Sequence, residues 1–125
     1  TRIWLLCGMM GLFTGGCLGF NLTYDAEYAV RNDSGQTLDE ATVRIGTEHM
    51  FNHGVLVLNA IKSYSGPMPL HSENQVAISW QDATGRVYEA VLNVSRKTLT
   101  DKRICLFMID PTMHVKQGWW LRDTD

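Results

Sequence analysis

The histidines and methionines of this sequence are its candidate metal-binding residues. His49 and His53 are four residues apart, a spacing that places two imidazoles on one face only in a helix. Thioether and imidazole ligands together favour copper, and Met50 and the pair Met113 and His114 could supply them. One hypothesis is therefore a copper-handling protein with His49, His53, Met113 and His114 as ligands. Against it, we expect residues 48–53 to form a loop with solvent-exposed histidines.

Two adjacent tryptophans near the C-terminal end are the second candidate site. Trp119 and Trp120 are followed closely by Arg122. Consecutive residues of a strand point to opposite faces, so we expect at least one indole to be exposed. Tryptophan and arginine are enriched in the energetic centres of interfaces, and tryptophan also favours the membrane–water boundary. The three residues are candidate partner-binding residues, unless an indole closes the open end of the core.

Motifs typical of enzymes are missing from the sequence. It has no Gly-x-Ser-x-Gly elbow, no phosphate-binding glycine loop and no His-Glu-x-x-His helix. The acidic residues Asp39, Glu40 and Glu48 stand near predicted turns, where solvated charges are expected. We predict a non-enzymatic protein without a cofactor.

The charges of the chain nearly balance, with 11 basic and 13 acidic residues and a net charge of −2. A nucleic-acid-binding domain would be expected to cluster basic residues on one face. We therefore expect no nucleic-acid partner.

The first twenty residues have the pattern of an export signal. Arg2 precedes an apolar run over residues 3–13, and small residues then precede Cys17. Gly15, Gly16 and Cys17 resemble the lipobox of bacterial lipoproteins, in which the cysteine is lipidated and becomes the first mature residue. The resemblance implies that Cys17 tethers the protein to the bacterial cell envelope, facing the periplasm or the exterior, with residues 18–25 as a spacer.

Two other interpretations of this leader stay open. Residues 3–20 could remain as an uncleaved anchor helix of an accessory subunit in a membrane complex, although a spanning helix needs about 20 apolar residues. Alternatively, an ordinary signal peptide is cut between residues 15 and 19. A disulfide between Cys17 and Cys105 requires a cut elsewhere in the leader. Otherwise Cys105, among apolar neighbours, is predicted to be a buried, inert thiol.

Beyond residue 20 the hydrophobic pattern has a period of two, which is typical of β-strands. Turn-forming clusters interrupt it at residues 32–36 and 81–85. The two prolines in residues 65–69 predict a loop or an edge crossing. The predicted strands cover residues 27–31, 41–45, 55–58, 76–80, 86–94, 104–109 and, at an edge, 113–121. In the strand 86–94, the residues expected to face the core are Tyr88, Ala90, Leu92 and Val94.

Six to eight short strands without a long amphipathic helix predict an antiparallel β-sandwich. Residues 27–94, with the turn sequence 30–35, the run 54–56 and the hairpin 78–85, are similar to the immunoglobulin-like or transthyretin-like domains of small bacterial lipoproteins. The resemblance implies an all-β, immunoglobulin-like sandwich over residues 21–125, preceded by an apolar signal or anchor helix in residues 1–20. We expect a binding or structural module that meets the membrane through its N-terminus and a protein partner at the envelope.

Overall fold

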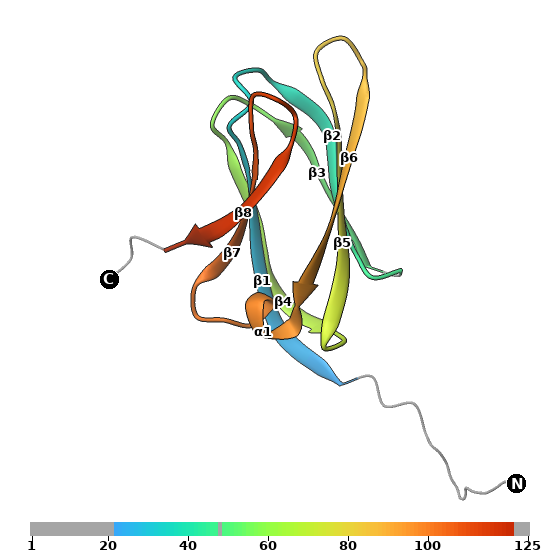
Figure 1. Cartoon of the computed structure of the whole chain (residues 1–125), viewed down its shortest axis with the longest axis vertical. Coiled ribbons are helices and arrows are strands. Elements are labelled where there is room, and N and C mark those ends of the chain that lie inside the picture. Colours follow the sequence, from blue (N-terminus) through green and yellow to red (C-terminus); the bar gives the residue numbers. More distant parts are fainter. Residues whose placement is uncertain (1–21, 48, 122–125) are drawn as a thin grey trace, which may run out of the picture.

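The computed structural model of this protein describes residues 22–47 and 49–121. The predicted leader, Cys17 and Arg122 lie outside these residues. In the described ranges, no helix is long and apolar enough to cross a bilayer. The elements in chain order (Figure 1) are β1 (Thr23–Asn32), β2 (Leu38–Ile45), β3 (His49–Leu56), β4 (Ile61–Pro69), β5 (Glu73–Gln81), β6 (Val87–Ser95), α1 (Arg96–Leu99), β7 (Ile104–Ile109) and β8 (Val115–Trp120).

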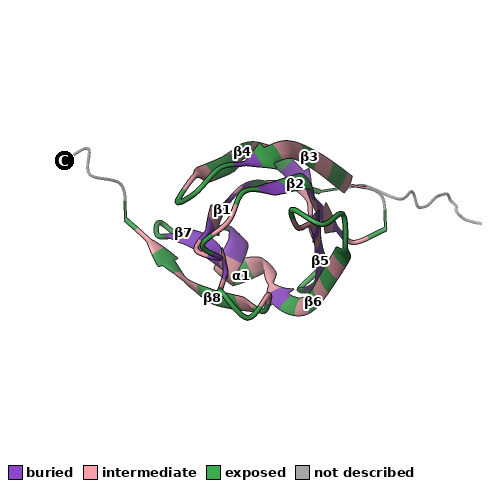
Figure 2. Cartoon of the chain, turned by 90° about the horizontal axis from the view of Figure 1, so that it is seen from above, coloured by how far each residue is buried: buried purple, intermediate pink, exposed green. Residues whose placement is uncertain are grey.

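The strands form two four-stranded sheets, with the orders β4-β1-β7-β8 and β3-β2-β5-β6. The neighbours β1 and β7 are parallel, and the remaining pairs are antiparallel. Figure 2 shows the sheets curving around a common interior, with buried residues in both sheets. The predicted β-sandwich is confirmed, with one parallel pair in place of a wholly antiparallel arrangement.

The core lies between the sheets because each strand turns alternate residues inward. Trp80, Tyr28 and Phe107 are its largest fully buried side chains. The predicted inner face of β6 is confirmed, since Val94 is buried and the other three residues pack against the core. Cys105 is a buried free thiol, as expected, and burial raises its pKa to about 12.

Two hairpin turns share one hydrogen-bonding pattern. In the predicted turn after β5, Asp82 Oδ1 accepts hydrogen bonds from the backbone N–H of Thr84 at 2.9 Å and of Arg86 at 3.1 Å. In the turn after β7, Asp110 Oδ1 accepts from the equivalent positions. Both turns also need a left-handed residue, which is Gly85 with φ +86° in the first. These turns lie at one end of the sandwich (Figure 1).

Three predicted boundaries are wrong in the middle of the chain. Residues 65–69 belong to β4, residues 49–53 belong to β3, and β3 ends at Leu56 rather than continuing to residue 58. Strand β4 is an edge strand with β1 as its hydrogen-bonded neighbour. An edge strand tolerates proline because the N–H groups on its outer side are not needed for pairing.

Buried asparagines fix the loops at the two ends of the sandwich. Asn32 is fully buried, and its Nδ2 donates hydrogen bonds to the carbonyls of Gln36 at 2.7 Å and Leu56 at 2.8 Å. Its Oδ1 accepts hydrogen bonds from the N–H and the hydroxyl of Ser34. At the opposite end of the sandwich, where β1 begins, the side chain of Asn74 forms hydrogen bonds with the backbone of His71. Side-chain hydrogen bonds therefore replace backbone pairing where the chain leaves the sheets.

Candidate functional site

The proposed copper ligands do not converge in the structure. His49 and His53 lie on strand β3, where a rise of about 3.3 Å per residue separates them by roughly 13 Å. His49 pairs with Ile45 at the end of β2, whereas His114 belongs to the turn after β7 at the opposite end of the sandwich. Within the described part of the chain, no group of three or more His, Cys, Asp or Glu side chains is placed to hold a metal ion.

His53 belongs to an aromatic cluster that closes the side of the sandwich between β3 and β4. Its Nε2 is hydrogen-bonded to the hydroxyl of Tyr28 at 2.6 Å. Burial raises the pKa of Tyr28, so the hydroxyl keeps its proton. Burial, with a smaller contribution from Lys62, lowers the pKa of His53. One of the two ring nitrogens of His53 is therefore occupied by a hydrogen bond between the sheets.

Met113 and His114 help to form the turn after β7. Met113 has φ +62° and occupies the left-handed position that glycine takes in the other turn, while its side chain packs against the core. His114 Nδ1 is hydrogen-bonded to the hydroxyl of Thr112 at 2.9 Å. Both residues thus contribute to the hairpin.

The two indoles lie on opposite faces of β8, as predicted. Trp120 packs against a small cluster on the outer face of its sheet, made by Ala29, Ile104 and Leu106. Trp119 pairs in register with the buried Cys105 and so points toward the inner side of the sheet. The exposed fraction of Trp119 is nevertheless 39%.

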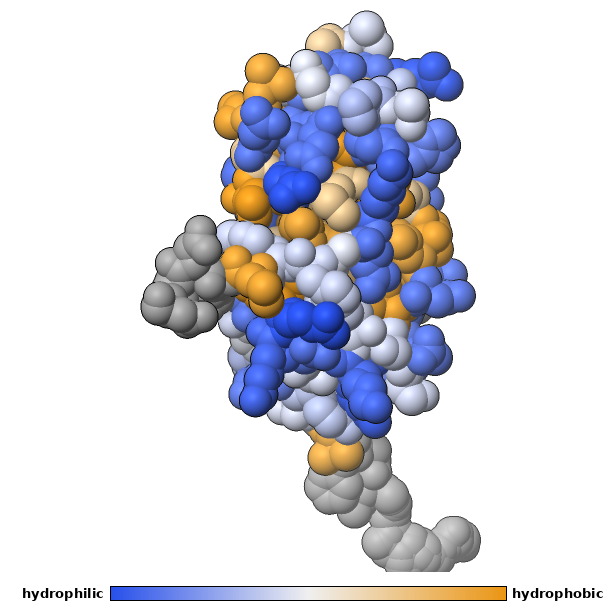
Figure 3. All heavy atoms as spheres, turned by 60° about the vertical axis from the view of Figure 1, so that its left-hand side comes forward, coloured by the Kyte–Doolittle hydropathy of each residue, from blue (hydrophilic) through white to orange (hydrophobic). Residues whose placement is uncertain are grey.

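The exposure of Trp119 follows from the position of β8 at the edge of its sheet. Gln117 also faces inward and is also exposed, so the edge of β8 extends past the cover of the opposite sheet. Arg103 stacks on the Trp119 ring at 4.0 Å from its centroid. Figure 3 shows hydrophobic residues as separate patches among hydrophilic ones on this side of the molecule.

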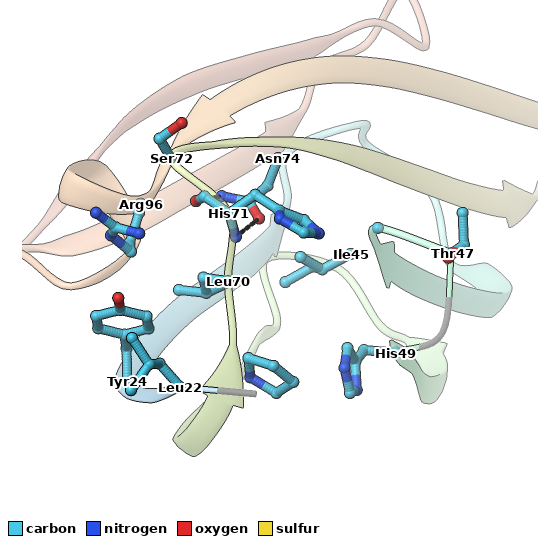
Figure 4. Close-up of a pocket in the computed structure, with 12 residues that line it drawn as sticks. Leu22, Tyr24, Ile45, Thr47, His49, Leu70, His71, Ser72, Asn74 and Arg96 are labelled. Atoms are coloured by element: carbon cyan, nitrogen blue, oxygen red, sulfur yellow. Dashed lines mark hydrogen bonds between the residues drawn. The ribbon is translucent and has the colours of Figure 1, made fainter. Parts of the chain in front are cut away.

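A hollow that the sequence did not indicate lies at the end of the sandwich where β1 begins (Figure 4). Its volume is about 570 Å³, and its walls come from the start of β1, the β2–β3 turn, the β4–β5 turn and the start of α1. We call it the β1-end hollow. Residues that are 74 positions apart in sequence, Leu22 and Arg96, both line it. Because these segments are distant in the chain, no local pattern could have identified the site.

The side chains in the β1-end hollow form two polar regions around an apolar floor. The imidazoles of His49 and His71 lie on one side in Figure 4, and the guanidinium of Arg96 lies on the other. Ile45 and Leu70 lie between them. Donor groups of three side chains thus surround an apolar surface, an arrangement suited to binding and orienting a small polar ligand.

The wall formed by the β4–β5 turn is held by Asn74. This side chain is 4% exposed, and its Oδ1 accepts a hydrogen bond from His71 N at 2.9 Å. Its Nδ2 donates to the carbonyls of His71 at 2.9 Å and Val94 at 3.3 Å. The backbone N–H of Arg96 donates to the Ser72 carbonyl at 3.0 Å. The positions of His71 and Arg96 are therefore coupled through one turn.

Arg96 is oriented by an aromatic ring. Its guanidinium carbon lies 4.6 Å from the centroid of Tyr24, in a cation–π contact. Stacking uses the face of the guanidinium and leaves the N–H groups at its edge available to an acceptor. A second hollow of about 460 Å³ adjoins this arginine and is also lined by Lys97 and Glu73.

Comparisons with known proteins bear on the fold of this chain. No protein-family model matches it, and no curated protein sequence matches it. A solved structure, the NMR structure of a protein from Eubacterium rectale, is similar with a TM-score of 0.50 and 11% sequence identity. The similarity covers 81% of this chain and 93% of that chain. At this identity it supports a shared β-fold and carries no information on activity.

Proposed function

We propose that this protein is an exported, membrane-tethered lipoprotein of the bacterial envelope, with its β-sandwich acting as a non-enzymatic binding module. The observation that supports the binding module is the exposed edge of β8, where Trp119 faces inward yet is 39% exposed. The tether is supported by the leader sequence that ends at Cys17. An inward-facing indole that stays partly exposed at a sheet edge, with Arg103 stacked on its ring, offers a surface that a partner protein can cover.

The tether in this proposal is Cys17. Strand β1 already begins at Thr23, so the spacer between a lipidated cysteine and the folded domain is residues 18–22, shorter than the sequence pattern predicts. A short spacer holds the sandwich close to the membrane with the β1 end facing it. The opposite end and the sheet edges then face a partner.

The partner's contribution would be an extended segment that pairs with the edge of β8. An edge strand presents unpaired backbone N–H and C=O groups, which add a further strand by main-chain hydrogen bonds. Trp119 supplies the large side-chain contact that such pairing needs for specificity. Arg103, stacked on the indole, provides a charged group at the same place.

For the order of the strands in the two sheets, we propose a transthyretin-like arrangement rather than an immunoglobulin-like one. An immunoglobulin constant domain places its first, second, fifth and fourth strands in one sheet. Here the first and second strands belong to different sheets, and the fifth strand lies between the second and the sixth. This order does not fit the immunoglobulin scheme.

The tether is tested by the intact mass of the protein extracted from bacterial membranes. We expect an N-terminus at Cys17 with the added mass of acyl chains. An unmodified full-length chain would instead favour the alternative of an accessory subunit anchored by residues 3–20. Recovery of a cleaved, unacylated protein from the soluble fraction would contradict both forms of membrane attachment.

The contact is tested by mild detergent extraction and quantification of a stoichiometric co-purifying protein. Trp119→Ala should lower its recovery about tenfold, as expected for an interface hot spot. The control is Val87→Ala, because Val87 is exposed on a different edge strand, β6. Equal recovery with both variants would exclude the β8 edge as the contact.

A further inference from the structure

The β1-end hollow must lie close to the membrane if the chain is membrane-attached as proposed above. Leu22 lines this hollow, and Cys17 precedes it by five residues. Five residues span at most about 18 Å even when fully extended. An uncleaved anchor ending at Phe20 would hold the hollow closer still. Both forms of attachment therefore bring this hollow to the headgroup layer.

The side chains in the hollow are suited to an anion. Arg96 has no ion pair among the described residues, and its N–H edge is left available by stacking on Tyr24. The described lining of this hollow includes two histidines and no carboxylate; Glu48, between the lining residues Thr47 and His49 in the sequence, lies outside the described residues. A guanidinium in such a setting recognises phosphate through paired N–H···O hydrogen bonds.

The size and floor of the hollow fit a phosphate that belongs to a larger molecule. A volume of about 570 Å³ falls in the range of small-molecule sites and exceeds the space that an inorganic ion needs. Ile45 and Leu70 supply apolar contacts between the polar regions. A glycerol-sized group attached to the phosphate could occupy this surface.

We propose that the β1-end hollow binds the phosphate group of an anionic ligand, which is either the headgroup of an anionic phospholipid or a soluble phosphorylated molecule. The lipid source rests on the membrane attachment proposed above, whereas the phosphate chemistry does not. Arg96 is the principal ligand, and the His71 imidazole faces it across the hollow from the turn that Asn74 holds.

Other charges near the hollow modulate this site. Lys97 adds a positive charge in the adjoining hollow, and Glu73 adds a negative charge there. Asp101 is paired with Arg103 at 3.5 Å, so its charge is locally compensated. Because attraction between exposed charges is screened by ions, binding should weaken as the salt concentration rises.

The test uses the full chain with Cys17→Ser in maltoside micelles, which contain no phosphate, and follows backbone amide shifts by NMR. Inorganic phosphate and then glycerol 3-phosphate are titrated in. We expect saturable shifts at His71, Ser72 and Thr47, and an affinity about tenfold lower in Arg96→Gln, because hydrogen bonds to charged groups are lost. The control is Arg86→Gln, which removes another arginine stacked on a tyrosine, at 5.2 Å from the Tyr88 centroid.

A second arm identifies the source of the phosphate. The same chain is inserted into nanodiscs of phosphatidylglycerol or of net-neutral phosphatidylcholine. Shifts at the hollow that are specific to phosphatidylglycerol and lost in Arg96→Gln support a lipid headgroup. Shifts that require glycerol 3-phosphate and are equal in both nanodiscs support a soluble ligand.

Two results would overturn the proposal. One is the absence of saturable shifts at the hollow with phosphate, glycerol 3-phosphate and phosphatidylglycerol. The other is an equal affinity in Arg96→Gln and Arg86→Gln. Unchanged amide shifts in the sheets verify that Arg96→Gln is folded, and His71→Gln provides a second variant. Failure of this site leaves Cys17 acylation and the Trp119 contact unaffected, so the two proposals fail separately.

Discussion

Replacing Asn32 should be among the most damaging single changes in this domain. Its fully buried amide links the loop after β1 to the end of β3 through hydrogen bonds to the carbonyls of Gln36 and Leu56. Asn32→Ala removes both donors, together with the acceptor used by Ser34 at 2.6 Å. Water cannot readily replace them, because the Leu56 carbonyl is bonded in a buried setting.

The expected cost follows from the number of bonds lost. Each buried hydrogen bond contributes about 1 kcal/mol, and a buried polar group left without a partner costs about 1–3 kcal/mol. Three of the five hydrogen bonds that the Asn32 side chain makes are buried, one donated to Leu56 and two accepted from Ser34. At about 1 kcal/mol each, we expect a loss of about 3 kcal/mol in the free energy of unfolding. For a domain of this size, that corresponds to a decrease in Tm of roughly 12–24 °C.

The assay is urea unfolding followed by circular dichroism, with Asn93→Ala as the control. Asn93 is exposed on strand β6, so its replacement should change the unfolding free energy by no more than about 0.5 kcal/mol. The midpoint should fall for Asn32→Ala while the slope m stays constant. A loss below about 1 kcal/mol would show that the two loops are held by other contacts and that the assigned role of Asn32 is wrong.

Three further changes test other parts of the structure. Because the pKa of His53 is lowered in the folded state, its contribution to stability should be complete above about pH 6.5 and decrease as the pH falls below that value. Thermal unfolding from pH 8 to 5 should therefore show a Tm that falls with pH. His53→Gln should reduce this pH dependence, and the exposed control His71→Gln should not. Gly85→Ala places a side chain at φ +86° with open space around the new Cβ, so the cost is backbone strain of about 1–2 kcal/mol, and a cost near zero in urea unfolding would contradict this origin. The Cys105 thiol, buried with its pKa raised to about 12, should react with a thiol reagent only as fast as the protein opens; rapid labelling of the native protein would contradict its burial.

Local sequence was sufficient to predict a structural feature where that feature depends on residues close together in the chain. The hairpin at residues 81–85 follows from an aspartate that accepts the N–H groups of its own turn and from a glycine that adopts positive φ. The inner face of β6 follows from alternation alone. These features depend on residues within a few positions of one another, so the sequence displays them directly.

Local sequence was insufficient to predict the strand boundaries in the segment from β3 to β4. The prolines in residues 65–69 predict a loop or an edge crossing. The structure has a regularly paired strand there, which accommodates the prolines because β4 lies at the edge of its sheet. The apolar residues Val57 and Leu58 predict a continuing strand, yet they are more than half exposed in a connection between the sheets. Whether a strand lies at an edge is decided by its neighbours in space, and those come from distant parts of the chain.

The sequence by itself determined the β class, the hairpin turn at residues 81–85, the buried thiol and the opposite orientations of Trp119 and Trp120, because each depends on a period of two or on local hydrogen bonds. Only the tertiary structure decided which indole stays exposed, since this depends on whether the opposite sheet covers the edge of β8. It also decided that His53 bonds to Tyr28 across the sheets and that Leu22, His49, His71 and Arg96 share one hollow. This hydrogen bond and this hollow bring together segments that are far apart in the chain. They form because one sheet closes over the other.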